Sequence, residues 1–461
     1  MDIISRSASV FITVEQQNSG IIYTLNQRPP LVEAVFAAFQ HFLAIFIPII
    51  TPTLIIGNLL ELQAEIPYLI SMAMIISGIA TFIQVKKVGP IGSGLLSIQG
   101  TSFAFLAPIV AAGLILKERG ASSQQILGTI FALCFLGSFI EMIASRFLHF
   151  LRKIITPIVT GTVVTLIGLS LIKVAVIDMG GGSALLNSGS GQFGNLTSLI
   201  LAGVTIVVIV LCNASKSQIL RMTSIVIGLL CGFILSLFLV DIDFSSISAL
   251  PVVSIPVPFK FGFHLDFEFF IPIALIYLIT TIESIGDLTA TSVVSQEPIR
   301  GDLYMKRIKG GVLGDGFNSM IASAFNTFPN TTFSQNNGVI QLTGVASRYV
   351  GMIVALFLLL FGLFPIVGGV LRLIPSSVIG AATLVMFGSV AAAGIKIIST
   401  TKLDRRSFLI LAVSFGLGLG VQFVPQILHN TPAIIQNIFG SSISTGGLSA
   451  IILNILLRKT S

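Results

Sequence analysis

The chain has 461 residues, of which 54% are hydrophobic and only 9% are charged, and its mean hydropathy is +1.01. Soluble domains carry about 25% charged residues, and a soluble fold could not hide this much apolar surface from water. The formal net charge of +7 does not indicate nucleic-acid binding, because the Lys and Arg residues fall in short clusters between apolar runs. The composition therefore predicts an all-α polytopic membrane protein.

The sequence contains fourteen candidate membrane segments after a polar stretch at 1–30. That stretch lacks the apolar core of a signal peptide, and we expect it to be a short cytoplasmic tail. A bilayer core of about 30 Å needs about 20 apolar residues in a helix. Segments near this length are 33–57, 66–85, 124–145, 154–175, 195–212, 222–241, 268–292, 349–371, 377–398, 406–424 and 440–457. A weaker, Gly-rich segment is 308–325, and two interrupted segments, 94–109 and 328–345, are too short and polar to span alone.

The basic residues support this count. With a cytoplasmic N-terminus, 20 of the 25 Lys and Arg residues fall in the loops predicted to be cytoplasmic, as the positive-inside rule expects. The exceptions are Lys117, Arg119, Lys173, Lys260 and Arg372. Leaving out either interrupted segment would invert every later loop, so both are expected to cross the membrane and the C-terminus is expected to be cytoplasmic.

The two halves of the chain resemble each other. The interrupted segments lie about 235 residues apart, and the first and eighth segments begin at the same offset. This indicates two seven-segment repeats of opposite orientation, 31–245 and 246–461, although a Gly-rich membrane protein can show such echoes by chance. Inverted repeats with a broken segment in each point to a substrate site near the bilayer midplane.

The interrupted segments are rich in Gly, Asn, Thr and Ser, which are poor helix formers. Irregular backbone at membrane depth survives only where protein buries it or where it lines a wet cavity. Its free N–H and C=O groups could bind a planar polar ligand. The alternative is a pair of re-entrant loops with a purely structural role.

Three carboxylates fall inside predicted membrane segments. Glu283 and Asp287 are spaced to share one helix face, and Asp315 lies between two glycines of the ninth segment. A carboxylate in mid-membrane costs at least about 2.5 kcal/mol, so each is a candidate to bind substrate N–H groups or to carry a proton. The alternative is a hydrogen-bonded tether between helices; it is weaker for Glu283 than for Asp287 and Asp315.

Other chemistry finds little support in the sequence. His41 follows Gln40 in the first segment, where a structural hydrogen bond and a ligand contact are both open. No His/Cys cluster has metal-ligand spacing, and no Ser has a nucleophile-elbow context. We therefore expect no metal, no cofactor and no enzymatic activity.

The stretch 335–344, QNNGVIQLTG, resembles the signature of the nucleobase–ascorbate transporter family, also called nucleobase:cation symporter-2. Four further stretches match that family in order and spacing, and the resemblance covers about 31 to 457. They are Gln40-His41, 99–103, 283–287 and 314–316.

The resemblance implies a fold and a set of roles. Segments three and ten would contain short antiparallel β-strands, segments 1–4 and 8–11 would form a core domain, and segments 5–7 and 12–14 a gate domain. Members often form homodimers, and here small residues in segments five and twelve suggest a gate-helix interface. By position, the implied substrate-binding residues are Glu283, Gln335, Phe103, Ser102, Phe333 and His41, and those serving structure or coupling are Asp287, Asp315 and Asn336.

Within the family, Gln335 at the first signature position and Gly344 at the last resemble the bacterial xanthine branch. The expected function is proton-coupled uptake of xanthine across the bacterial inner membrane by alternating access of core against gate. Ser102 stands where some xanthine-selective members carry Asn, so a urate or mixed xanthine/urate permease is the runner-up. An anion transporter of the same architecture is a more distant alternative, and a channel is disfavoured because no ring of charges is present.

Overall fold

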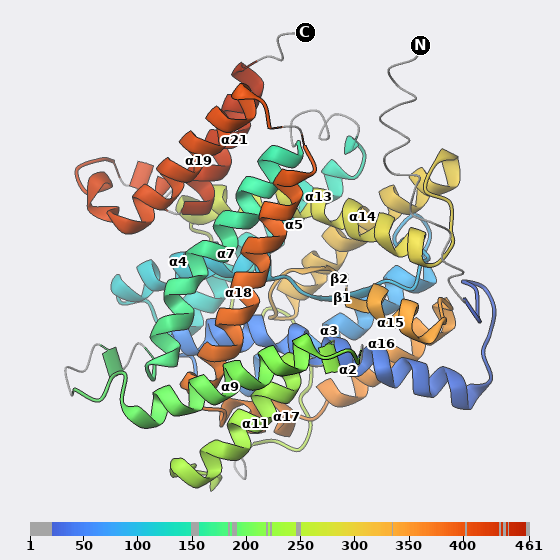
Figure 1. The fold of residues 1–461 in the computed structure, drawn as a ribbon, viewed down its shortest axis with the longest axis horizontal. Helices are drawn as coiled ribbons and strands as arrows, with labels where there is room; N and C mark the ends of the chain where they lie inside the picture. The colour runs from blue at the N-terminus through green and yellow to red at the C-terminus, as the bar shows by residue number, and fades with distance from the viewer. Residues whose placement is uncertain are drawn as a thin grey trace.

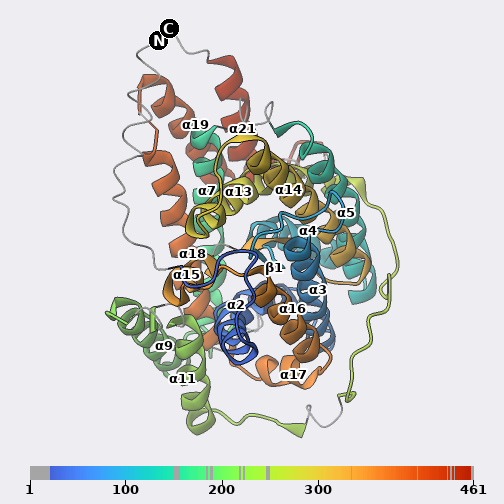
Figure 2. The same ribbon diagram turned by 90° about the vertical axis from the view of Figure 1, so that its right-hand side faces the viewer.

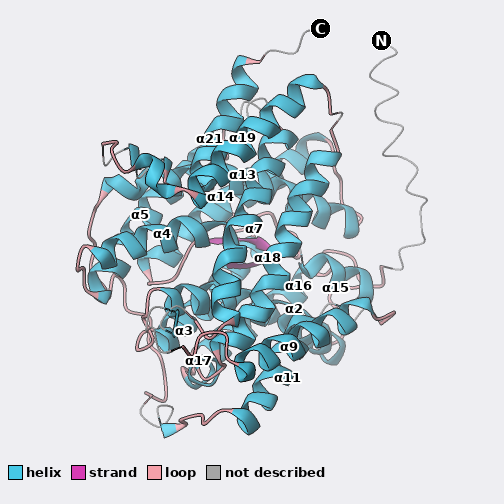
Figure 3. Ribbon diagram, turned by 60° about the vertical axis from the view of Figure 1, so that its left-hand side comes forward, coloured by secondary structure: helices cyan, strands magenta, loops and turns pink. Residues whose placement is uncertain are grey.

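The computed structural model describes most of the chain as helices packed around two short strands, which lie near the middle of the molecule (Figure 3). The described residues are 21–148, 156–182, 185–186, 191–217, 220–221, 224–245, 250–333, 335–401, 403–432, 435–436, 439–440 and 442–457. Most of the predicted tail, 1–20, and residues 154–155, 222–223, 334 and 441 of the predicted segments lie outside these ranges.

Within the described residues, eight helices are long and apolar enough to cross a membrane, and they confirm eight predicted segments within a few residues. They are α2 (Leu31–Leu59), α3 (Ile66–Lys86), α5 (Ser123–Ala144), α7 (Pro157–Met179), α9 (Leu196–Ala214), α13 (Phe270–Val294, preceded by the 3-10 turn η2, Phe267–Phe269), α18 (Ser376–Ser399) and α19 (Arg405–Phe423). The chain is therefore a multi-pass membrane protein.

Helices also occupy the other predicted segments, but they are shorter, more polar or interrupted. They are α4 (Leu106–Glu118, after the 3-10 turn η1, Phe103–Phe105), α11 (Ser224–Leu239), α14 (Gly301–Ala324), α15 (Gln335–Thr343) and α21 (Ser442–Leu456); a 3-10 turn, η3 (Pro425–Leu428), follows α19. The count of fourteen spans and the inverted repeats therefore stay predictions.

The segment predicted at 349–371 is not one straight helix. It consists of α16 (Arg348–Gly362) and α17 (Ile366–Arg372), which meet at an angle of 73°. Pro365 precedes α17, and a proline has no N–H to continue the helical ladder. The carbonyl of Leu363, released at this break, accepts a hydrogen bond of 2.8 Å from the N–H of Ser254.

The strands β1 (Ile98–Thr101) and β2 (Asn330–Phe333) pair antiparallel, which confirms the short strands expected in segments three and ten. In this register Gly100 lies opposite Thr331, and a Cβ on Gly100 would come within 2.6 Å of the Phe333 ring. The glycine therefore allows Phe333 to lie across β1. The pair joins segments more than 200 residues apart in the chain, and helices enclose it (Figure 1).

The long helices α7 and α18 pack against each other along much of their lengths (Figure 1). A Cβ on Gly168 would lie 2.4 Å from the backbone N of Ala391, and one on Gly394 would lie 2.4 Å from that of Thr165. The small residues of segments five and twelve thus serve close packing within one chain. Because these small residues pack within one chain, they do not support a dimer interface formed by segments five and twelve.

The helices α9 and α11 lie side by side at one edge of the molecule, and α19 and α21 form another pair (Figure 2). The described part of the N-terminal segment lies against the end of α15. There Tyr23 forms a parallel bridge with Val345, and the N–H of Ile22 donates to the carbonyl of Gly344 at 2.7 Å. Gly344 has a φ of +68°, which favours glycine at this helix end.

Candidate functional site

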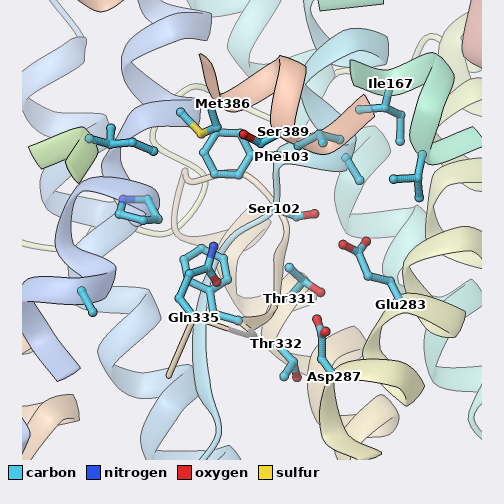
Figure 4. A pocket seen from close by; sticks show the side chains of 17 residues that line it. Ser102, Phe103, Ile167, Glu283, Asp287, Thr331, Thr332, Gln335, Met386 and Ser389 are labelled. Carbon is cyan, nitrogen blue, oxygen red and sulfur yellow. The ribbon is translucent and has the colours of Figure 1, made fainter. Parts of the chain in front are cut away.

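A cavity of about 400 Å³ lies beside the strand pair (Figure 4). This volume falls within the range of about 300–1,000 Å³ that is usual for small-molecule sites. Its lining comes from both halves of the chain: Ala44, Pro48, Ser102, Phe103, Ala104, Val164, Ile167, Ile225, Glu283, Asp287, Thr331, Thr332, Phe333, Gln335, Met386, Ser389 and Val390. Of the predicted substrate-binding residues, the structure brings five together here: Ser102, Phe103, Glu283, Phe333 and Gln335.

The acids of the cavity come from α13. Because helical residues four apart share a face, Glu283 and Asp287 both project into the cavity, where Thr331 lies between Asp287 and Ser102 (Figure 4). The Glu283 side chain is exposed, so both of its oxygens can reach a ligand. None of the described lining residues is basic, and the polar part of the cavity is therefore suited to a ligand that offers hydrogen-bond donors.

Gln335 lies across the cavity from Glu283 (Figure 4). It is the first residue of α15, and its side chain is exposed. Phe103 similarly begins η1, one residue after the end of β1. The first turns of both helices carry backbone N–H groups without helical partners and a partial positive charge. This side of the cavity can therefore donate to carbonyl oxygens, and the Glu283 carboxylate opposite can accept from N–H groups.

Two amides next to Gln335 fix the position of α15. The Nδ2 of Asn336 donates to the carbonyl of Leu96 at 2.7 Å, and the Oδ1 of Asn337 accepts from the Thr291 hydroxyl at 2.8 Å. These bonds tie α15 to the chain just before β1 and to α13. Asn336 is buried and does not line the cavity; its contact is a positioning one.

Asp315 is fully buried behind the strands and does not line the cavity. One of its oxygens, Oδ2, accepts from the Ser284 hydroxyl at 2.5 Å and from the N–H of Thr332 at 3.2 Å. The other, Oδ1, accepts from the Nε2 of Gln84 at 3.0 Å. Asp315 thus joins α3, α13 and β2, which favours the hypothesis that it is a hydrogen-bonded tether between these elements.

Gln84 was not identified from the sequence, although it connects several parts of the site. Besides Asp315, its Nε2 donates to the carbonyl of Gly311 at 3.2 Å, and its Oε1 accepts from the N–H of Ser93 at 3.1 Å. Gln99 extends the network by donating to the Thr332 hydroxyl at 2.9 Å. The available signal was an amide near the end of an otherwise apolar span, since buried polar groups in a membrane are costly unless bonded.

His41 does not reach the cavity. Its side chain is fully buried in α2, and neither ring nitrogen has a hydrogen-bond partner within the described part of the chain. Because His41 does not line the cavity, the structure shows no contact among the described residues that would support its predicted role in substrate binding.

The residues of the cavity wall opposite the strands were also not identified from the sequence. It consists of Val164 and Ile167 of α7, Ile225 of α11, and Met386, Ser389 and Val390 of α18. Five of these six residues are apolar. The cavity is therefore polar on the strand side and apolar on the side of α7, α11 and α18.

Comparison with known proteins gives consistent sequence matches. The family model described as "Permease family" matches residues 32–427. The xanthine permeases XanP and XanQ of Escherichia coli (strain K12) are each 48% identical to the chain, over 96% of its length and 96% and 95% of theirs. The nucleobase transporter PlUacP of Paenibacillus larvae is 34% identical over 91% of this chain and 93% of its own. These matches confirm the resemblance drawn from the motifs.

Among solved structures, the fold is similar to the transmembrane domain of the cyanobacterial bicarbonate transporter BicA, with a TM-score of 0.58 and 14% identity over 90% of this chain and 99% of that one. It is also similar to murine SLC26A9, an anion transporter in the inward-facing state, with a TM-score of 0.60 and 14% identity over 94% and 69%. At this identity the likeness concerns the fold alone.

The Asp315 network predicts a stability effect. Asp315→Asn replaces one acceptor oxygen with a donor, which then faces donors from Ser284, Thr332 or Gln84. An unsatisfied buried group costs about 1–3 kcal/mol, so the variant should unfold at a lower temperature in detergent even without ligand. Asp302→Asn, at an exposed position of α14, is the control and should behave as wild type. Equal melting of Asp315→Asn and wild type would contradict the tether.

Proposed function

The chain belongs to the nucleobase–ascorbate transporter family, a family of permeases, and on that premise we propose that it takes up xanthine together with protons across the bacterial inner membrane. The observation that carries the proposal is Glu283, an exposed carboxylate that borders the cavity beside the paired strands β1 and β2. The relatives named xanthine permeases, at 48% identity, support the choice of xanthine.

Glu283 suits the N–H edge of xanthine. An ionised carboxylate only accepts hydrogen bonds and can take two neighbouring N–H groups at once. Such charge-assisted bonds are roughly twice as strong as bonds between neutral groups. The ring system of xanthine presents several N–H donors on a flat frame, so one of its edges can pair with both oxygens of Glu283.

The other edge of xanthine carries oxo groups and an unprotonated ring nitrogen, which need donors. Gln335 can supply its amide N–H, and the first turns of η1 and α15 can supply backbone N–H groups. Phe103 and Phe333 offer ring faces beside the ligand plane. Ser102 contributes a small hydroxyl, which leaves room for the additional oxo group of urate; a mixed xanthine/urate range is the runner-up.

An anion transporter is the more distant alternative, and the fold alone does not separate it from a nucleobase permease. The charge of the cavity does argue against it. Two carboxylates, Glu283 and Asp287, line the cavity, and none of its described lining residues is basic. The two carboxylates would repel an anion.

Transport would proceed by alternating access between two bodies. The core would be segments 1–4 and 8–11, which contribute the strands, α13 and the polar wall; the gate would be segments 5–7 and 12–14, which contribute the apolar wall. The apolar wall can slide without breaking hydrogen bonds to the ligand. The homodimer is proposed from family resemblance; the gate helices α9 and α19 are only 28% buried within one chain and leave surface for a partner or lipid.

Proton coupling predicts how uptake responds to a protonophore. One charge moved across ~100 mV corresponds to about 2.3 kcal/mol, or roughly 50-fold accumulation. Labelled xanthine should therefore accumulate in energised membrane vesicles, and the accumulation should disappear when a protonophore is added. Replacing sodium with potassium should leave it unchanged. A strict requirement for sodium would rule out proton symport.

The role of Glu283 predicts the largest loss of binding. In Glu283→Gln one substrate N–H would meet another donor, at a cost of about 1–3 kcal/mol, which is roughly a five- to 150-fold loss of affinity. Gln335→Ala removes a neutral bond and should weaken binding less. The measurement is equilibrium binding of labelled xanthine to purified variants, with Glu118→Gln, an exposed position of α4, as the control. Wild-type affinity in Glu283→Gln would show that the ligand does not bind there.

A further inference from the structure

Glu141 is a buried acid to which neither the fold nor the proposed site gives a role. It lies one turn before the end of α5, and its side chain is only 1% exposed. Its Oε1 has no hydrogen-bond partner among the described residues. It is the only carboxylate in the predicted segment 124–145, and it does not line the cavity.

The packing of α5 against α14 places Glu141 beside the acids of the site. A Cβ on Gly316 would lie 2.9 Å from the backbone N of Met142 and 3.1 Å from the carbonyl of Ser138, so the two backbones touch on either side of Glu141. Asp315 directly precedes Gly316. The helix α13, which carries Glu283, also packs against α5, so that negative charges on Glu141, Asp315 and Glu283 would repel one another.

The other titratable groups near Glu141 supply no compensating charge. From α13, besides Glu283, Tyr277 faces α5 and donates its hydroxyl to the Cys134 carbonyl at 2.8 Å. The charged residues of α4 lie in its last turn, next to the start of α5 and far from Glu141. None of the ion pairs found between described residues includes Glu141.

This setting suits the protonated form of Glu141. An ionised carboxylate there would be buried beside two other acids and would leave an oxygen without a donor, which is costly in a membrane protein. Glu283 has the opposite requirement, because it must be ionised to accept two N–H groups from the ligand. While the ligand is bound, a proton that crosses with it must therefore be bound by a residue other than Glu283.

We propose that Glu141 holds the transported proton while Glu283 holds the nucleobase. This inference rests on the proposed function. Glu283, which is exposed to the cavity, takes up a proton and passes it to Glu141: one O–H bond breaks at Glu283 and one forms at Glu141. Glu283 is then an ionised acceptor for xanthine. After the ligand leaves, Glu141 releases the proton toward the end of α5, which the charge pattern places on the cytoplasmic side.

The test compares two kinds of transport in proteoliposomes with Glu141→Gln, which has the same shape but cannot release a proton. Counterflow, in which labelled xanthine exchanges for unlabelled xanthine, needs no net proton movement and should be retained. Accumulation driven by an imposed proton gradient should be lost, so that inside and outside concentrations only equalise. The control is Glu118→Gln, which should keep both.

The outcomes are distinguishable. Accumulation by Glu141→Gln at the wild-type level would overturn the proposal, whereas a wild type that neither exchanges nor accumulates xanthine would overturn the proposed function instead. If Glu141→Gln does not fold, Glu141→Asp decides: it keeps a carboxyl at a shifted position, so the pH profile of its gradient-driven uptake should move while its counterflow persists. A profile identical to that of wild type would then reject the role of Glu141.

Discussion

The pairing of β1 with β2 satisfies backbone polar groups of two short strands that are buried inside a largely apolar protein. The strands satisfy one another through the ladder, and Asp315 accepts from both the backbone and the hydroxyl of Thr332. Because an unpaired polar group at this depth costs several kcal/mol, Gln84, Gln99 and Ser284 are bound into the same network. This network ties β2 to α13, and both elements line the cavity.

From that constraint follows the asymmetry of the site. Strand ends and the helices that begin beside them present N–H groups, α13 presents carboxylates, and α7 and α18 close the cavity with apolar side chains. The polar parts belong to elements linked by hydrogen bonds, while the apolar wall belongs to a helix pair held by close glycine contacts. A ligand bound to the polar part could therefore stay in place while the apolar wall moves, as alternating access requires.

Much of this was accessible from the sequence, because the signals were strong where membrane physics is strict. Apolar length located eight spans, and the polar interruptions located both strands. Glu283 was a candidate because an acid in mid-membrane is costly, whereas Gln335 was expected only from the resemblance to the family signature; both line the cavity. The pairing and packing of helices were less accessible. The positions of Gln84, Glu141 and Met386 relative to the site depend on which helix lies opposite. His41 was also a polar candidate inside a predicted segment, but it lies outside the cavity. The bend before α17 was missed although Pro365 signals it.

The proposed function requires that the cavity at Glu283 bind a purine. The most direct measurement is competition for labelled xanthine bound to the purified chain, using unlabelled purines, pyrimidines, sulfate and bicarbonate. We expect that xanthine competes best, that purines lacking the paired N–H groups compete weakly, and that neither inorganic anion competes at all. Displacement by sulfate or bicarbonate, with no preference among purines, would contradict it.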